Sequence, residues 1–169
     1  MTLPTQTTLS GPRTPHETAP GTAPESAPRA RTERTEGITW THLIHKVQEA
    51  GRYPTPGEAE HITRTVLSAL GAHVTGDERA ALARALPDEA AKTVAAQTPA
   101  PHPRTAPEFV DSIAATLAGA TPATARWHVS SVLSVLPDLI GDDLVTRVLA
   151  RLPPGYALLF GRADLSRTP

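Results

Sequence analysis

The chain has 169 residues, with 16 Lys and Arg against 17 Asp and Glu, a formal charge of −1 at pH 7, and no cysteine. This length fits one domain or two very small ones. The lack of cysteine excludes disulfides, zinc–thiolate sites, iron–sulfur clusters and thiol nucleophiles. The balanced charge argues against binding of nucleic acid or of an anionic membrane by bulk electrostatics.

Residues 1–37 hold six of the 18 prolines and no aromatic residue. Such a segment buries too little apolar surface to offset the entropy of ordering the chain, about 1–2 kcal/mol per residue. We therefore predict a disordered tail rich in Pro, Thr and Ala, which acts either as a solvated spacer or as a docking peptide. Residues 163–169 are predicted to form a second disordered end.

The start of the chain lacks the cationic residues and apolar run of a secretory signal. The longest apolar stretch, Val129 to Ile140, contains Pro137 and Asp138. It is far shorter than the roughly 20 residues that a membrane-spanning helix needs. These features predict a cytoplasmic protein without membrane contact.

Helical periodicity and helix-start motifs begin at about residue 38. Trp40, Leu43 and Val47 recur on one helical face. Threonines at 55 and 75, each followed three residues later by Glu, are typical of capping boxes. The predicted helices cover about residues 39–50, 55–70, 75–86 and 88–96, and then Glu108 to Ala118, Pro122 to Leu136, Asp142 to Leu152 and Gly155 to Phe160. No stretch shows the alternation of a strand, so we predict an all-α fold.

A proline cluster at residues 98–107 predicts a stiff linker between two regions of similar length. When the second region is shifted back by 66 positions without a gap, 11 of 52 residue pairs between 43–94 and 109–160 are identical. The matches fall on helix starts, helix ends and apolar stripes, which indicates an internal duplication. We predict two helical repeats of about 55 residues, 38–97 and 108–162, packed as one helical bundle or short solenoid.

The segments that carry a resemblance to a known family are residues 65–70, 85–89, 131–136 and 151–160. With their Val-Leu-x-x-Leu stripes and Leu-Pro endings, they resemble a bacterial family named domain of unknown function 2267. The resemblance covers about residues 38–162 and leaves the tail out. It implies an all-helical fold and supplies no activity, cofactor or catalytic residue.

Histidines are the side chains that first suggest chemistry. On the predicted first helix, His42, His45 and Glu49 share the solvent face, where two imidazoles and a carboxylate could bind a divalent metal. The alternative is a solvated face. Glu58 and His61 have the spacing that di-metal bundles use, but Glu58 is already explained as part of a helix cap.

The sequence contains no nucleophile motif, phosphate-binding loop or other catalytic constellation. We therefore expect neither a cofactor nor an enzymatic activity. Its arginines are spread among acidic residues, and no helix carries the basic run that would suit a DNA groove. This pattern disfavours nucleic acid as a partner.

Trp127 is the most suggestive single residue, because it points away from the apolar stripe of its predicted helix. Ser130, Ser131 and Ser134 lie around it and leave room for the indole to pack flat against another surface. Two interpretations stay open: Trp127 closes the contact between the repeats, or it is an exposed anchor for a partner protein. His128 falls on the buried side of the same helix, as a satisfied histidine or as a pH-sensitive contact.

These observations lead to one functional hypothesis and one alternative. The first is a non-enzymatic helical-repeat module that binds another protein, with its N-terminal tail as tether or docking segment. The alternative is a small metal-binding protein or enzyme that uses the face of His42, His45 and Glu49.

Overall fold

The computed structural model describes residue 11 and residues 39–162 of the chain. The tails predicted at residues 1–37 and 163–169 lie outside the described residues. The described part contains helices and no strand, which confirms the predicted all-α class. In chain order the helices are α2 (Trp40–Gly51), α3 (Pro56–His73), α4 (Gly76–Ala85), α5 (Asp88–Ala95), α6 (Ala106–Thr116), α7 (Pro122–Leu133), α8 (Leu136–Ile140), α9 (Asp142–Arg151) and α10 (Tyr156–Leu159).

Threonine caps start four of the helices. The side chains of Thr39, Thr55, Thr105 and Thr121 each accept a hydrogen bond from the backbone N–H three residues later. Only Thr105 has the complete reciprocal capping box, in which Glu108 also accepts from the Thr105 backbone N–H at 2.8 Å. For this reason α6 begins at Ala106, earlier than the predicted start at Glu108.

Two details of the predicted helices differ from the structure. Thr75 occupies the predicted cap position but makes no side-chain cap hydrogen bond. The helix predicted from Pro122 to Leu136 is instead two helices, because α7 ends at Leu133 and α8 begins at Leu136. Pro137 explains the break, since its ring would clash with the carbonyl of residue 133 in a continuous helix.

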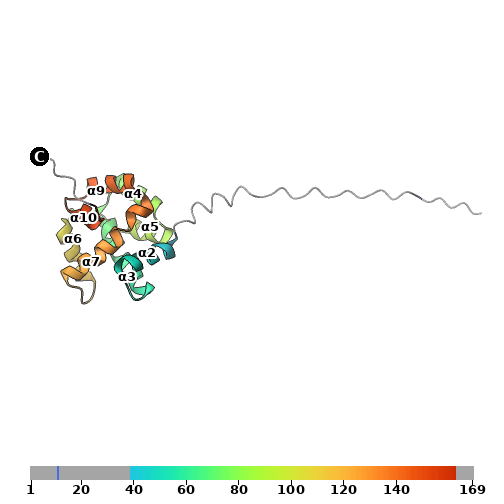
Figure 1. Ribbon diagram of the computed structural model, residues 1–169. Helices are drawn as coiled ribbons and strands as arrows, with labels where there is room; N and C mark the ends of the chain where they lie inside the picture. Colours follow the sequence, from blue (N-terminus) through green and yellow to red (C-terminus); the bar gives the residue numbers. More distant parts are fainter. Residues whose placement is uncertain (1–10, 12–38, 163–169) are drawn as a thin grey trace, which may run out of the picture.

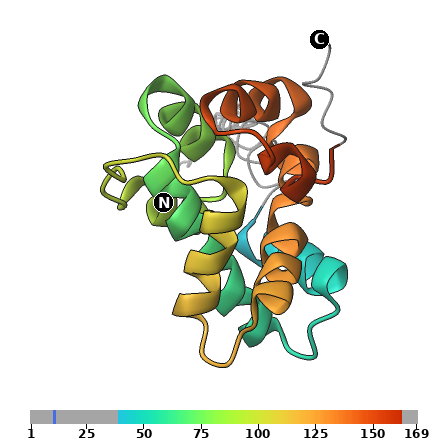
Figure 2. The same ribbon diagram turned by 90° about the vertical axis from the view of Figure 1, so that its left-hand side faces the viewer.

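A single cluster of buried apolar side chains runs through the first half of the chain (residues 39–97) and the second half (residues 106–162). Helix α7 lies among α2, α3, α6 and α10, and Figure 2 shows it beside α6. Helices α4 and α9 pack together at the top of Figure 1. The two halves therefore share one core.

Two of the contacts between the halves are crossed. Helix α2 of the first half packs on α7 of the second, and α3 of the first half packs on α6 of the second. Simple translation of one unit along a solenoid would give only one of these two contacts, so the arrangement favours a bundle. The relation of the halves as sequence repeats stays a prediction. An ion pair between Glu78 of α4 and Arg151 of α9, at 3.3 Å, adds a polar contact between the halves.

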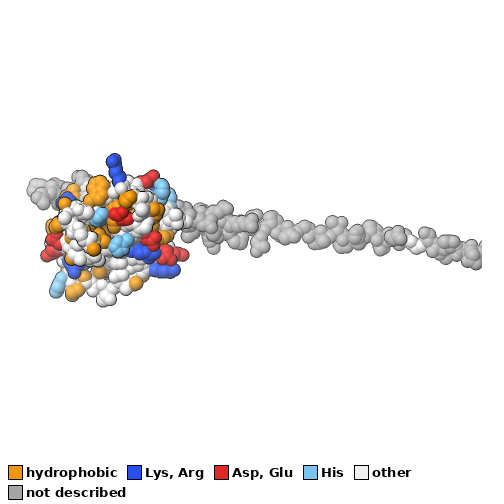
Figure 3. Space-filling model, turned by 90° about the horizontal axis from the view of Figure 1, so that it is seen from below, with side chains coloured by type: hydrophobic (Ala, Val, Ile, Leu, Met, Phe, Trp, Pro, Cys, Tyr) orange, Lys and Arg blue, Asp and Glu red, His pale blue; other side chains and the backbone are white. Residues whose placement is uncertain are grey.

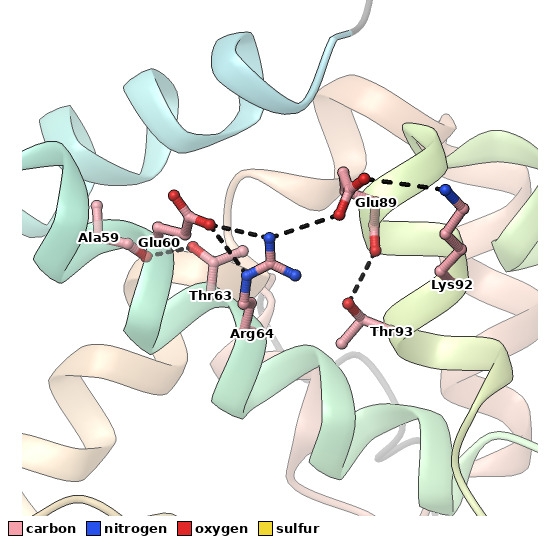
Figure 4. A network of polar contacts seen from close by, with 7 residues as sticks. All are labelled: Ala59, Glu60, Thr63, Arg64, Glu89, Lys92 and Thr93. Carbon is pink, nitrogen blue, oxygen red and sulfur yellow. Dashed lines mark hydrogen bonds and ion pairs between the residues drawn. The ribbon is translucent and has the colours of Figure 1, made fainter.

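Within the first half, Arg64 connects three helices. Its guanidinium pairs with Glu60 at 2.9 Å and with Glu89 of α5 at 3.5 Å (Figure 4). The same group lies 4.7 Å from the ring centre of Trp40 on α2, in a cation–π arrangement. The side chains of Arg64, Glu60 and Glu89 are all partly exposed, so their ion pairs add little to the free energy of unfolding. Their main effect is to position α2, α3 and α5 relative to one another.

The C-terminal end of α5 is held from α4. The Arg79 side chain donates to the carbonyl oxygens of Val94 and Ala95 at 3.0 and 2.9 Å, and also to the carbonyl of Gln97. Val94 and Ala95 are in the last turn of α5, where carbonyls lack partners within the helix, and the guanidinium adds to the Gln97 N–H that also reaches the Val94 carbonyl. Its positive charge interacts favourably with the helix dipole.

None of the helices formed by the described residues combines the length and the apolar character needed to cross a lipid bilayer. Seen from below, acidic and basic side chains lie next to one another on the surface, among apolar ones (Figure 3).

Gly71 sets the distance between α3 and α5. A Cβ atom at this position would lie 2.6 Å from the carbonyl oxygen of Val94 and 2.9 Å from its Cα. We predict that Gly71→Ala lowers the free energy of unfolding by about 1–3 kcal/mol, because the backbone of α5 must move away. Urea unfolding followed by circular dichroism measures the change.

Gly57 provides the matched control for this substitution. It lies in the first turn of the same helix, where an added Cβ meets no atom within 4 Å. Gly57→Ala is expected to leave the stability unchanged or to raise it slightly. Equal effects of the two substitutions would contradict the close approach of α3 and α5.

Candidate functional site

Trp127 lies on the outer side of α7. A threonine cap at Thr121 and a proline at the first helical position start this helix, and Ala125, Val129 and Val132 are its buried side. Trp127 is 52% exposed, and Trp127 and Leu158 are the large apolar residues with the greatest exposure in the described part of the chain. The indole is nevertheless fixed, because its Nε1–H donates to the carbonyl oxygen of Gly51 at 3.2 Å.

The next residue of α7 makes a second polar contact with the end of α2. The Tyr53 hydroxyl and Nδ1 of His128 are 2.8 Å apart, and the two rings are tilted by 32° with their centres 5.5 Å apart. Tyr53 is 7% exposed, so this hydrogen bond lies at the edge of the core. We call Gly51, Tyr53, Trp127 and His128 together the α2–α7 contact.

The chain around Arg52 has a specific conformation that positions this contact. Arg52 ends α2 with φ 53°, in the left-handed region, and its N–H returns to the carbonyls of Gln48 and Glu49. A Cβ at residue 51 would lie 2.1 Å from the Tyr53 ring, so the ring packs directly on the glycine backbone. The Gln48 amide donates to the Tyr53 carbonyl at 3.2 Å. Glycine at 51 is therefore required for Tyr53 to reach His128.

Burial controls the protonation of both partners. It raises the pKa of the Tyr53 hydroxyl, although the hydroxyl of Ser131 lowers it to a smaller extent. It also lowers the pKa of His128, against a smaller opposing effect of the Glu58 carboxylate. Near neutral pH both groups are uncharged, so the phenol donates to Nδ1 in one imidazole tautomer and Nδ1–H donates to the phenol oxygen in the other.

The three serines predicted to surround Trp127 have different environments. Ser134 is exposed and Ser130 is partly exposed. Ser131 is only 5% exposed, and its hydroxyl donates to the carbonyl oxygen of Trp127 at 2.8 Å. Ser131 is therefore part of the packing between α7 and the end of α2, and it does not belong to the exposed surface that the sequence predicted.

An apolar groove lies between the first turns of α7, α6 and α10. Its volume is about 390 Å³. Arg126 of α7 and Asp111 of α6 are its charged residues, and the exposed Leu158 of α10 is one of its walls. The remaining lining residues are Ala106, Pro107, Val110, Pro122, Ala123, Gly155 and Leu159. Sequence reasoning did not identify this groove, because three helices distant in sequence form it.

The face proposed for a metal is only partly assembled. His45 and Glu49 are paired, with Nδ1 and Oε2 3.6 Å apart and both side chains about two-thirds exposed. His42 is also exposed. Among the residues that the structure describes, no three His, Asp or Glu side chains form a group that could hold a metal ion. The metal-binding alternative thus stays a prediction without support from this geometry.

The fold and the site describe a small helical domain with an ordered aromatic side chain and an apolar groove on its surface. The family of the uncharacterized conserved protein DUF2267 matches residues 40–159. The chain therefore belongs to this family, as its sequence pattern predicted. The search of curated proteins gave no match.

A second histidine, His73, is buried inside the fold. It lies at the end of α3 with its ring edge against Phe109, 5.7 Å between ring centres. Its Nδ1 atom is buried and has no hydrogen-bond partner among the described residues. Burial lowers the pKa of His73, and the charge of Arg104 lowers it further.

This lowered pKa predicts acid sensitivity. Below about pH 6.5 the unfolded chain binds a proton at residue 73 before the folded protein does. The free energy of unfolding should therefore fall as the pH drops from 6.5 toward the pKa of the folded state. In His73→Leu this contribution disappears, and the slope of stability against pH decreases by up to about one proton.

Urea unfolding at pH values between 7.5 and 5 measures both slopes. His128, whose pKa burial also lowers, is present in both proteins, so its effect cancels in the comparison. Identical slopes for the two proteins would show that His73 does not resist protonation in the folded state.

Proposed function

We propose that this protein is a non-enzymatic interaction module that binds another protein through the outer side of α7. The observation that carries the proposal is Trp127, which is half exposed although it is held in one position. Aromatic residues of this kind dominate binding energy at protein interfaces. Covering the exposed part of the indole in a complex would remove further apolar surface from water and so add to the affinity.

The attachment of the indole to Gly51 supports an anchor role. A side chain that binding must immobilise costs about 0.5–1.5 kcal/mol in lost freedom. Trp127 has already lost much of this freedom, because its Nε1–H is bonded to the backbone of α2. The two interpretations of Trp127 are therefore compatible: its polar edge closes the contact between the halves, and its exposed ring surface is available to a partner.

The groove beside α7 extends the same surface. On a helix with 100° between residues, Arg126 and Trp127 lie on adjacent faces, so the groove that Arg126 lines adjoins the indole. We infer that a partner places an apolar side chain in the groove and covers Trp127 with a neighbouring residue. Asp111 and Arg126 would then form part of a polar rim, as is usual for protein interfaces.

The remaining parts of the hypothesis concern residues and surroundings beyond the described fold. We propose that the N-terminal 37 residues serve as tether or docking segment for the same complex and that the protein acts in a bacterial cytoplasm. Comparison of the full chain with a chain that begins at Gly37 separates the tail from the helical body, because a partner retained by the shorter chain binds the helices.

The test of the anchor uses a partner that co-purifies with the full-length chain and is then purified by itself. We predict that Trp127→Ala weakens its binding at least tenfold, about 1.4 kcal/mol, whereas Trp127→Phe keeps much of the apolar contact and loses less. Isothermal titration calorimetry gives the dissociation constants. Leu158→Ala reports separately on the groove.

Lys92→Ala is the control, because this exposed lysine is on α5, which does not line the groove. Thermal melts of each variant separate binding from stability. A Trp127→Ala protein that keeps its melting temperature and binds the partner with unchanged affinity would refute the anchor.

A further inference from the structure

The two hydrogen bonds of the α2–α7 contact come from neighbouring residues of α7 and end on either side of Arg52. Trp127 bonds to the carbonyl of residue 51, and His128 bonds to the hydroxyl of residue 53. Between these points Arg52 has φ 53°, a left-handed conformation that is unfavourable for a residue with a Cβ. The contact therefore maintains a backbone conformation that has an intrinsic cost.

The bond between Tyr53 and His128 depends on the protonation of the imidazole. In a neutral histidine one ring nitrogen accepts, and the pH dependence argued here requires that atom to be Nδ1, which is 2.8 Å from the phenol oxygen. In a protonated histidine both ring nitrogens are donors, so Nδ1 can no longer accept from Tyr53. The buried phenol must then direct its proton to another acceptor.

A neighbouring acceptor lies on the same helix as His128. The Ser131 hydroxyl lowers the pKa of the Tyr53 phenol and donates to the carbonyl oxygen of Trp127 at 2.8 Å. When the phenol donates to Ser131, the hydrogen bond from the Ser131 hydroxyl to the Trp127 carbonyl is affected as well. Trp127 directly precedes His128 in the chain. The protonation of one imidazole thus reaches both hydrogen bonds of the contact.

The charged surroundings of His128 are sparse. In the described part of the chain, Glu58 in the first turn of α3 is the charged group that acts on it, and its carboxylate favours the protonated form. Burial at the edge of the core opposes that form more strongly. Protonation of His128 is therefore favoured by a conformation in which its ring is less buried against the end of α2.

We propose that the α2–α7 contact is a pH-sensitive switch, in which protonation of His128 loosens the end of α2 and releases the Trp127 indole from Gly51. The contact is intact at neutral pH and opens as the pH falls below the ordinary titration range of histidine. This inference rests on the proposed function, since it makes acid a regulator of the surface that holds the partner. Its physical step concerns the protein alone and does not require the partner.

The test is an NMR titration of the full-length, nitrogen-15-labelled chain from pH 8 to pH 5. It follows the indole N–H signal of Trp127 together with the Cε1–H signal of His128. We expect both signals to move with the same midpoint, and the Trp127 indole hydrogen to exchange faster with water in the acidic form. Trp40, the other tryptophan of the chain, is the first residue of α2, at the opposite end of the helix from Gly51, and contacts Arg64. It serves as an internal control whose signal stays in place.

Two variants make the test specific. Glutamine can accept from Tyr53 without titrating, so His128→Gln should abolish the movement of the Trp127 signal. Tyr53→Phe removes the hydroxyl and should uncouple the two signals while His128 still titrates. A Trp127 signal that stays fixed while His128 titrates, or that moves equally in His128→Gln, would overturn the switch and leave the proposed anchor role untouched.

Discussion

One side of helix α7 is buried against the first half of the chain and against α6, and the α2–α7 contact and the groove both depend on that burial. Ala125, Val129 and Val132 on its inner side belong to the common core. Alanine and valine are small, so α2, α3 and α6 can all pack against it. Because neither half has many large side chains of its own, much of the apolar surface that stabilises each half is supplied by the other.

The burial of one side of α7 determines what its other residues do. Once the inner side is fixed, Trp127 and His128 face the end of α2, while Arg126 faces the groove next to α6 and α10. One helix therefore positions both the polar α2–α7 contact and the apolar groove. This arrangement explains how a residue that helps to join the halves can also be the most prominent aromatic group on the surface.

The sequence was sufficient for the local parts of this account. Thr55 and Thr121 start helices because threonine caps are local, and the apolar stripes give the buried sides of α3 and α7 correctly. The break at Pro137 and the capping box of Thr105 and Glu108 follow from equally local rules. The break and the capping box could both have been predicted if these local rules had been given more weight. The apolar stripe that runs past Pro137 and the proline-rich composition around Thr105 were given more weight instead.

The site could be predicted only in part, because its partners come from distant segments. Periodicity placed Trp127 outside, but a helical wheel also places Ser131 near it, since the two residues differ by only about 40°. Ser131 is buried and Trp127 is half exposed, and nothing in the sequence of α7 reveals that difference. Tyr53, in a chain with few aromatic residues, directly follows a helix end, yet its bond to His128 joins residues 75 positions apart.

The central claim is that the two halves are stable only together. Thermal unfolding followed by circular dichroism, on residues 38–97 alone and on residues 38–162, tests it most directly. The shared core predicts one cooperative transition for the longer chain and weak helicity without a cooperative transition for the first half alone. A cooperative melt of residues 38–97 by themselves would contradict the claim, because it would show that the first half needs no contact with α7.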